Sequence, residues 1–362
     1  MIPEVLLAYH PKNEAESTQL EHALKEPLHQ AGVALSRRAT DARSGSLPPQ
    51  SHRRVRVVIA MIGSNGSVPT INPATFSKNT LIVPTLIQGS LDVDIKISAA
   101  IKQRSVLTFE VSLSDGASLA RLTSAIPQLV RPVGGLNHSL PEAIANSLFE
   151  STIRFYEENA ESFIHMHEEE IPKAQMSEIF SFVSQVERRR RLTERARILD
   201  AGCGPGHHAR FFAKCGFTAI GIDCCSRFIQ HATAVSKGDC SFVEGDMQKL
   251  DSYFSEEYRF EGIWANASCL HLPRGAVARV LDQFRRYLRP NGVLGISFQL
   301  GMSTLQREGR FFERYEANEP GEMLRQHGFA VIETLEGQAT KSTTGRKRIK
   351  QWLSLVAVPV AS

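Results

Sequence analysis

The stretch "ARILDAGCGPGHHARFF", residues 196–212, decides the fold. A short apolar run precedes three glycines at alternate positions, Gly202, Gly204 and Gly206, and a helix-like pattern follows them. In a parallel α/β sheet the turn after the first strand lies at the carboxyl edge, where ligands bind. Glycine lets the backbone of such a turn approach a ligand closely. We therefore expect a ligand site at this turn.

The residues around the turn distinguish between two classes of cofactor. A dinucleotide site requires G-x-G-x-x-G, with the pyrophosphate against the helix N-terminus. Here His207 occupies the position of the third dinucleotide glycine, and Asp200 precedes the first glycine. A carboxylate at that position would repel a pyrophosphate but would suit an ammonium group. The turn therefore points to S-adenosylmethionine, which offers an amino acid and a sulfonium instead of phosphates.

Two further acidic residues follow at the spacing that this cofactor requires. Asp223 ends "TAIGID", 19 residues after Gly204, and is expected to accept hydrogen bonds from both ribose hydroxyls. Asp246, in "CSFVEGDM", follows the next predicted strand and should lie beside the adenine, with Met247 packed on the ring. Either carboxylate alone would most often be a solvated strand-end residue. Their order and spacing behind the glycine turn favour the cofactor site.

These motifs resemble the class I S-adenosylmethionine-dependent methyltransferases over roughly residues 154–362. The segments that carry the resemblance are "ILDAGCGPG", "AIGIDCCSRFI", "FVEGDMQKL", "FEGIWANASCLHLPR" and "LRPNGVLGISF". The resemblance implies S-adenosyl-L-methionine as the cofactor and adds Cys203 and Asn266 to the residues that bind it. It also implies that "RFYEENAESF" (154–163) is a helix that caps the cofactor, with Tyr156 and Asn159 placed there.

The second half of the chain alternates strands and helices. It predicts a C-terminal domain, residues 143–362, with a Rossmann-like, seven-stranded, doubly wound sheet preceded by capping helices between about 143 and 194. The expected strands are 196–201, 218–222, 240–243, 260–265, 291–298, 329–335 and 352–358. The expected helices are about 207–215, 226–236, 274–287 and 319–327.

The first half, residues 1–135, predicts a smaller α/β domain, because buried-type strands such as "VRVVIAMI" (55–62) accompany a helical pattern. Its order faintly resembles a TIR-type domain, and an unrelated flavodoxin-like fold fits equally well. Enzymatic TIR-type domains carry a glutamate between the third and fourth strands, whereas residues 64–80 contain no acidic residue. We therefore expect a non-catalytic module for binding or oligomerisation, which could make the protein a homo-oligomer. "RPVGGLNHSLP" (131–141) is the candidate boundary.

One histidine is the candidate catalytic residue. Methyl transfer from a sulfonium depends on alignment and on exclusion of water, and a base helps when the acceptor carries a proton. His271, in "NASCLHLPR", follows the fourth predicted strand of the second domain. The alternative is that its imidazole caps the next helix or packs at the edge of the cofactor.

A small-molecule acceptor is favoured over a nucleic acid. The chain has neither the Asp/Asn/Ser-Pro-Pro-aromatic turn of enzymes that methylate exocyclic amines of bases nor the Pro-Cys pair of base C5 methylation; Cys269 follows a serine and is expected to be buried. Two basic clusters, 187–197 and 345–350, keep an RNA or protein methyltransferase as an alternative. A non-catalytic, cofactor-binding interaction protein is the third hypothesis.

Composition limits the remaining possibilities. The 362 residues are 42% hydrophobic and 22% charged, with a net charge of +4, which is typical of a soluble two-domain protein. We expect no membrane partner, because no apolar run approaches the roughly 18–20 residues of a membrane span and the N-terminus lacks a secretion-signal pattern. The six cysteines have no zinc-site spacing, so we expect no metal, reduced thiols and a cytoplasmic location.

Overall fold

The computed structural model describes most of the chain, and every structural statement below concerns the described residues. These are 4–40, 55–63, 69, 71, 76, 81–87, 108–114, 116–130, 142–168, 176–190, 195–238, 240–301, 305–307, 309–341 and 348–360. Among the helices of these residues, none combines the length and the apolar character that crossing a membrane requires.

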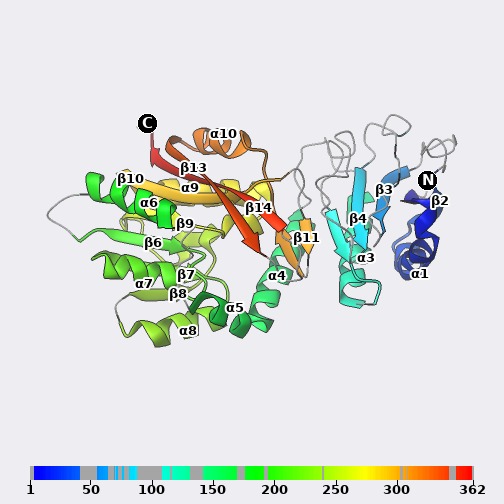
Figure 1. Ribbon diagram of the computed structural model, residues 1–362, viewed down its shortest axis with the longest axis horizontal. Helices are drawn as coiled ribbons and strands as arrows, with labels where there is room; N and C mark the ends of the chain where they lie inside the picture. Colours follow the sequence, from blue (N-terminus) through cyan, green and yellow to red (C-terminus); the bar gives the residue numbers. More distant parts are fainter. Residues whose placement is uncertain are drawn as a thin grey trace. The chain divides into compact units, whose positions relative to one another are not determined.

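Contacts divide the chain into two compact units (Figure 1). The first unit comprises Met1–Phe149 together with Met302–Phe312, and the second comprises Glu150–Gly301 and Glu313–Ser362. The first division therefore falls at residue 149, inside helix α4 (Glu142–Glu158). The boundary expected at 131–141 lies outside the described residues. The assignment of 302–312 to the first unit differs from the continuous C-terminal domain expected from the sequence.

The second unit contains a seven-stranded sheet in the order β13-β14-β10-β9-β6-β7-β8. Strand β14 runs antiparallel to both of its neighbours, and the other neighbouring pairs are parallel. The strands are β6 (Arg197–Ala201), β7 (Thr218–Asp223), β8 (Ser241–Glu244), β9 (Phe260–Ala265), β10 (Leu288–Gln299), β13 (Phe329–Lys341) and β14 (Arg348–Pro359). This order confirms the predicted Rossmann-like, doubly wound sheet.

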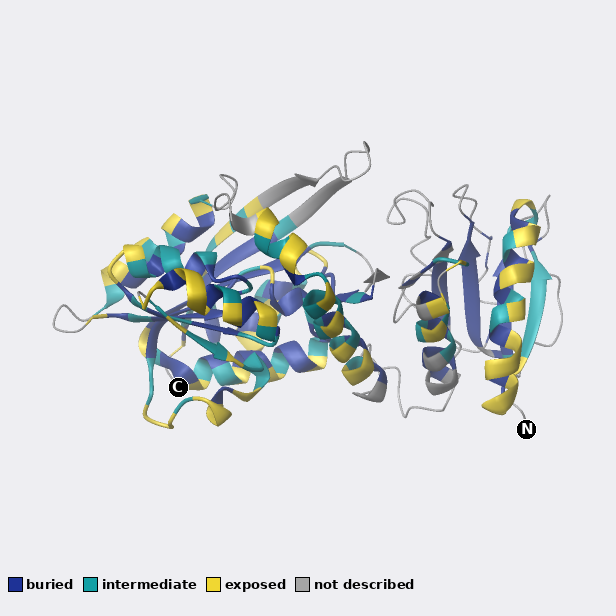
Figure 2. Ribbon diagram, turned by 90° about the horizontal axis from the view of Figure 1, so that it is seen from below, coloured by how far each residue is buried: buried dark blue, intermediate teal, exposed yellow. Residues whose placement is uncertain are grey.

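Helices cover both faces of this sheet, since every residue of β9 is buried and both alternating sets of side chains therefore point into a core. Figure 2 shows buried strands surrounded by helices whose outer sides are exposed. In the described part of the unit the remaining helices are α5 (Ala160–Glu168), α6 (Met176–Arg189), α7 (His207–Lys214), α8 (Ser226–Ser236), α9 (Arg274–Tyr287) and α10 (Glu319–Gln326), and the 3₁₀ turns are η6 (Met247–Ser252) and η7 (Cys269–His271).

One core lies beneath α6 and α7. Phe182 of α6 packs against Phe212 of α7 and Trp264 of β9, with ring centroids 5.6 Å and 5.0 Å away. Ile179, Phe182 and Val186 recur at helical spacing on one face of α6, and all three are 0% exposed. Truncating a buried phenylalanine of this kind to alanine typically costs about 3–5 kcal/mol. This packing holds β6 and β9, two of the strands whose carboxyl ends carry the site.

The first unit has a second seven-stranded sheet, in the order β12-β11-β5-β4-β3-β1-β2. Its first five strands, in sequence order, pair in parallel in the order 2-1-3-4-5 that flavodoxin-like folds share. Helices α1 (Glu14–Gln30) and α3 (Gly116–Val130) contribute to one core with these strands. The strands are β1 (Glu4–Tyr9), β2 (Ala34–Ala39), β3 (Val55–Ile62), β4 (Leu81–Ile87) and β5 (Thr108–Val111), and a 3₁₀ turn, η1 (Pro11–Asn13), precedes α1.

A hairpin from much later in the chain completes this sheet. Strands β11 (Leu305–Arg307) and β12 (Arg310–Phe312) follow β10, yet β11 pairs in parallel with β5 and Phe311 is fully buried in the core of the first unit. The sequence did not predict this exchange, because strands of three residues carry little periodic signal.

Candidate functional site

The glycine turn follows β6 and leads into α7. Gly202, Gly204 and Gly206 have φ angles of +75°, +51° and +82°, which L side chains rarely adopt. A Cβ on Gly202 would lie 2.2 Å from Cβ of Ser268, and one on Gly206 would lie 2.6 Å from the ring of Phe242. A Cβ on Gly204 would meet no atom within 4 Å. Gly204 is therefore the glycine at which the backbone borders open space that a ligand can approach.

Asp200 lies beneath the turn rather than inside the open space. Its side chain is 1% exposed, and Oδ2 accepts a hydrogen bond from the backbone N–H of Ala209 in the first turn of α7, 3.0 Å away. Burial raises the pKa of Asp200 to about 8, against the lowering effect of that hydrogen bond. The expected role at an ammonium group stays a prediction, and the observed role is to join β6 to the start of α7.

Asp223 ends β7 and holds the turn directly. Oδ2 accepts a hydrogen bond from the backbone N–H of Gly204 at 2.9 Å, and Oδ1 accepts one from Cys225 at 2.8 Å. Burial raises the pKa of this carboxyl group, against the lowering effect of the backbone hydrogen bonds. A carboxylate has about four lone-pair positions, so each oxygen retains capacity for another donor. Two ribose hydroxyls fit this capacity.

Asp246 and Met247 follow β8 at the start of η6. The Asp246 carboxylate accepts hydrogen bonds from the backbone N–H and the side-chain amide of Gln248, at 2.9 and 3.2 Å. Met247 Cε lies 3.2 Å from the position that a Cβ on Gly202 would occupy. The structure therefore places Met247, which follows the third strand, next to the glycine turn. The expected places of Asp246 and Met247 at the adenine stay predictions.

Helix α5 lies beside α8, which begins just after Asp223 (Figure 1), and the last turn of α4 also reaches α8. Glu157 of α4 accepts a hydrogen bond from the backbone N–H of Ser226 in the first turn of α8. Arg227 of α8 pairs with Glu161 of α5 at 2.7 Å. The sequence did not single out Glu157, although it follows Tyr156 directly. Asn159 donates to the carbonyl of Phe155, 2.8 Å away, at the junction of α4 and α5.

Tyr156 and His271 form a hydrogen bond across the site. The hydroxyl oxygen of Tyr156 lies 2.8 Å from Nε2 of His271, and the two rings meet edge to face with centroids 5.3 Å apart. Pro273, which has no polar side chain, occupies the N-cap position of α9, so His271 is not the N-cap residue itself. His271 instead faces α4. The role of His271 as a base or as a structural residue stays a prediction.

The segment between β9 and His271 is held by a side chain of β10. Ser297 Oγ donates to Oδ1 of Asn266 at 2.9 Å and accepts from the backbone N–H of Ala267 at 2.8 Å. Ala267 has φ +51°, an uncommon conformation for alanine, immediately after the strand. Asn266 thus lies at the carboxyl edge beside the glycine turn, and its carboxamide oxygen is engaged by Ser297.

The two cysteines of the site are buried. Cys203 is 3% exposed and Cys269 is 0% exposed. Burial raises the pKa of Cys203, and it raises the pKa of Cys269 to about 12. Both thiols are therefore neutral near pH 7, whereas covalent chemistry requires a thiolate nucleophile. The burial agrees with the expectation that Cys269 is a packing or pocket-lining residue and not a nucleophile.

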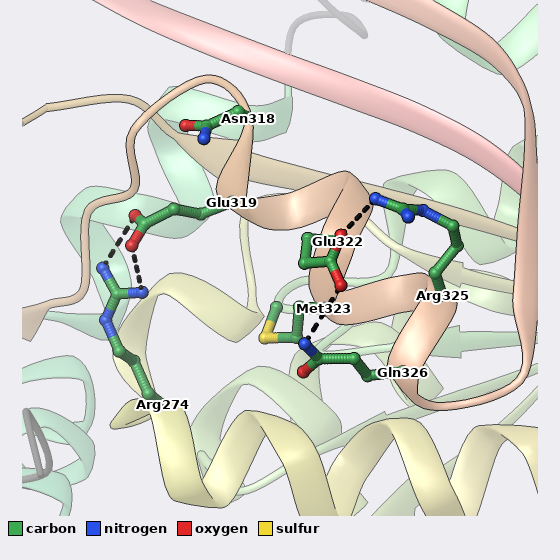
Figure 3. Close-up of a pocket in the computed structure, with 7 residues that line it drawn as sticks. All are labelled: Arg274, Asn318, Glu319, Glu322, Met323, Arg325 and Gln326. Carbon is green, nitrogen blue, oxygen red and sulfur yellow. Dashed lines mark hydrogen bonds and ion pairs between the residues drawn. The ribbon is translucent and has the colours of Figure 1, made fainter.

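A guanidinium supports the segment that carries His271. Arg274, in the first turn of α9, forms two 3.0 Å hydrogen bonds to the carboxylate of Glu319, and Figure 3 shows the two groups facing each other. Arg274 also pairs with buried Glu313 at 3.1 Å and lies over the ring of Tyr315 at 4.5 Å. The hollow beside this pair has a volume of about 480 Å³ and reaches along α10 to Gln326.

The site as a whole fits the cofactor that the turn predicted. Parallel pairing places Asp200 opposite Gly221 in β7 and Trp264 in β9, so the residues after β6, β7 and β9 meet at one edge of the sheet. The open side of Gly204 and the remaining acceptor capacity of Asp223 suit a ligand with two adjacent hydroxyls. The residue-by-residue assignment to the cofactor remains a prediction.

Comparison with known proteins also indicates a methyltransferase domain. Residues 198–292 match the family model described as "Methyltransferase domain". A malonyl-[acyl-carrier protein] O-methyltransferase of Erwinia pyrifoliae is 31% identical over 99 residues, which are 26% of this chain and 34% of that protein. A trans-aconitate 2-methyltransferase of Deinococcus radiodurans is 29% identical over 103 residues, 28% of this chain and 37% of that protein. The chain spans little more than a third of the length of these curated relatives.

One solved structure is similar over a longer range. A 1,6-didemethyltoxoflavin-N1-methyltransferase of Burkholderia thailandensis, bound to S-adenosylhomocysteine, covers 64% of this chain and 93% of its own length, with a TM-score of 0.47 and 18% identity. The family match covers residues 198–292 and so gives no support to a TIR-type likeness in the first unit.

Proposed function

We propose that the chain is a class I S-adenosylmethionine-dependent methyltransferase that transfers the methyl group of S-adenosylmethionine to a small-molecule acceptor, in line with the methyltransferase-domain match over residues 198–292. One observation carries the proposal: the three left-handed glycines of the turn are joined to the second-strand carboxylate by the hydrogen bond from Gly204 to Asp223. The cofactor supplies an electrophilic methyl group, so the protein has to bind, align and exclude water.

Each part of the turn has a proposed role in holding the cofactor. The backbone at Gly204 borders the amino-acid part, Asp223 accepts from the ribose hydroxyls, and Met247 packs near the adenine end with Asp246 beside it. Tyr156 and Asn266 border the same space from α4 and from the end of β9. Asp200 contributes indirectly, because its hydrogen bond to Ala209 fixes the start of α7.

The position of the arginines supports a small-molecule acceptor over RNA. Of residues 187–197, the described ones end α6 at Arg189 and begin β6 at Arg197, at the amino edge of the sheet, and residues 191–194 lie outside the described residues. The glycine turn, Asp223 and His271 follow the carboxyl ends of their strands, at the opposite edge. A nucleic acid bound along the first cluster would therefore lie away from the methyl-transfer position. The side chains of the second cluster, 345–350, lie outside the described residues.

The first unit is proposed to be an accessory domain for binding or oligomerisation. Its five parallel strands in flavodoxin-like order could present a ligand site or a protein surface. Its sheet is completed by the 305–312 hairpin of the C-terminal half, so this unit and the second unit are joined by more than one chain crossing.

Calorimetry and methyl transfer test the proposal on the full chain. The protein should bind S-adenosylmethionine and S-adenosylhomocysteine with 1:1 stoichiometry. Incubation with methyl-tritiated cofactor and a panel of phenols, alcohols, amines, thiols and carboxylic acids should then label a small molecule. A folded protein that binds neither cofactor form would contradict the proposal. Cofactor binding with label found only on RNA or protein would move the acceptor to the alternative class.

A further inference from the structure

The hydrogen bond between Tyr156 and His271 joins two sides of the cofactor site. On one side, the Tyr156 ring packs against Phe228 of α8, which follows β7, with centroids 5.9 Å apart. On the other side it reaches His271, which follows β9. In the sheet, β6 lies between β7 and β9, and the glycine turn continues directly from β6. Tyr156 therefore spans the end of the strand that carries the turn.

Its surroundings fix the tyrosine ring. Phe163 of α5 meets the ring edge to face at 5.0 Å, and Phe155 does so at 5.8 Å. The neighbouring Glu157 accepts from the backbone of Ser226, which ties this turn of α4 to the start of α8. A side chain held by rings on several sides keeps its hydroxyl in one place, which is the requirement for preorganised proton transfer.

The chemistry of the pair indicates which atom carries the proton. A phenol is a stronger acid than a neutral imidazole N–H, and an imidazole nitrogen is a stronger base than a phenol oxygen. The favoured arrangement therefore has the Tyr156 O–H donating to Nε2 of His271, with the ring proton on Nδ1. In that arrangement the Nε2 lone pair points at the tyrosine hydroxyl and is not open to an acceptor molecule.

We infer that Tyr156 is the residue that receives the acceptor's proton, and that His271 is a positioning base acting through it. The inference rests on the proposed methyltransferase function. The acceptor lone pair forms the new bond to the methyl carbon, and the electrons of the S–CH₃ bond remain on sulfur, which becomes a neutral thioether. The acceptor proton moves to the Tyr156 oxygen, while the Tyr156 proton moves to Nε2 and leaves His271 as an imidazolium. Charge and atoms balance.

The relay also defines the class of acceptor. It assists only an atom that carries a proton and loses it, such as a hydroxyl, a phenol or a primary or secondary amine. A carboxylate, a tertiary amine or a thioether arrives without such a proton and gains nothing from the pair. The acceptor is therefore assigned to the protic class.

The first test is a spectroscopic one on the full chain and needs no acceptor. Long-range proton–nitrogen spectra of protein labelled with ¹⁵N-histidine are recorded near pH 8, where an ordinary imidazole is neutral. His271→Gln identifies the two signals. We expect Nδ1 protonated and Nε2 as an unprotonated nitrogen that accepts a hydrogen bond. Tyr156→Phe should move the Nε2 signal downfield, whereas Tyr258→Phe, the matched control on a ring stacked by Arg197, should not. A protonated Nε2 in the unaltered protein would overturn the proposed proton transfer from Tyr156 to His271, even if the Tyr156→Phe variant fails to fold.

The second test uses turnover with an acceptor found in the panel. Tyr156→Phe and His271→Gln should each lower single-turnover rates by about 10²-fold or more. The double variant should be within about threefold of the slower single variant, because the two residues act as one unit. Cofactor affinity should stay within about twofold for His271→Gln, which is not among the residues proposed to hold the cofactor. Additive losses, or methylation confined to carboxylates and tertiary amines, would overturn the inference. Failure of the unaltered protein to bind cofactor would instead remove the proposed function.

Discussion

The backbone N–H of Gly204 donates to Oδ2 of Asp223 over 2.9 Å, so the carboxylate at the end of the second strand fixes the turn after the first. Nineteen residues separate the two in sequence. The same carboxylate is the proposed partner of the ribose. One side chain thus shapes the ligand-facing backbone and offers its remaining lone pairs to the ligand, which makes it the most informative position to alter.

Asp223→Ala should weaken S-adenosylmethionine binding by about 1.5–3 kcal/mol, or roughly 10- to 150-fold in Kd. The change removes charge-assisted hydrogen bonds to the ribose and releases the N–H groups of Gly204 and Cys225. Calorimetry measures the effect. Asp251→Ala is the matched control, because Asp251 is an exposed carboxylate in the neighbouring 3₁₀ turn. Equal affinities for the two variants would show that Asp223 does not contact the cofactor.

Gly202→Ala should destabilise the second unit more than Gly216→Ala. Both glycines have positive φ, +75° and +90°, so both variants incur the left-handed penalty of about 1–2 kcal/mol. Only at Gly202 would the new Cβ meet a neighbour, Ser268, at 2.2 Å, while nothing lies within 4 Å at Gly216. Overpacking typically adds about 1–3 kcal/mol.

Urea unfolding followed by tryptophan fluorescence compares these two glycine variants. Both tryptophans of the chain, Trp264 and Trp352, lie in the second unit, so the signal reports on that unit. Cofactor binding should fall for Gly202→Ala and stay unchanged for Gly216→Ala. Equal unfolding midpoints would mean that the backbone at Gly202 can shift away from Ser268 without cost.

The pH dependence of stability should reveal the buried Asp200. Its pKa is raised to about 8 in the folded protein, against about 3.9 in an unfolded chain. Between these values the folded state binds the extra proton, so this residue makes stability fall as pH rises from about 4 to about 8. Asp200→Asn keeps an oxygen that can accept from Ala209 and removes the titration.

The urea midpoint of the unaltered protein should therefore drop more between pH 5 and pH 8 than that of Asp200→Asn. The raised pKa of Asp223 adds a slope of the same sign to both proteins, so the difference between them reports Asp200 together with its electrostatic coupling to Asp223. Asp251→Asn, at an exposed site, should keep the same dependence of the urea midpoint on pH as the unaltered protein. Parallel pH profiles for Asp200→Asn and the unaltered protein would mean that Asp200 is already ionised when buried.

Local patterns were sufficient to predict the second unit's sheet and most of its helices. Helices α8 and α9 span 226–236 and 274–287, and β9 spans 260–265, as expected from apolar periodicity. Such elements are encoded by neighbouring residues, and the glycine turn fixed their order. The hairpin 305–312 could not be predicted in this way, since its partner strand β5 lies about two hundred residues earlier and only tertiary contacts select it.

In the candidate site, too, some features could be predicted from local sequence and others depend on tertiary packing. The spacing of Gly204, Asp223 and Asp246 predicted that these residues gather at one edge of the sheet, because parallel strands end together. The sequence did not indicate that Asp200 would be buried under α7, or that Tyr156 would meet His271 from 115 positions away. Those relationships depend on how α4 and α7 pack, which no local pattern encodes.

The last prediction concerns Arg274, which supports the segment that follows His271. Its guanidinium pairs with Glu319 through two hydrogen bonds and with Glu313, whose side chain is 4% exposed. Arg274→Ala leaves the buried Glu313 carboxylate without this guanidinium, and breaking a buried pair costs about 3–5 kcal/mol. Because Arg274 itself is about one-third exposed, we expect a loss below that range, about 2–3 kcal/mol, in the tryptophan-detected unfolding.

Three further variants separate the charge effect from lost packing. Arg325→Ala removes an exposed guanidinium paired with Glu322 and should change stability by no more than about 0.5 kcal/mol. Arg274→Lys keeps the charge but not the planar fork over Tyr315, so it should recover only part of the loss. Adding Glu313→Gln to Arg274→Ala removes the buried charge and should restore part of the stability. If that double variant is less stable than Arg274→Ala alone, lost packing rather than the stranded carboxylate explains the defect.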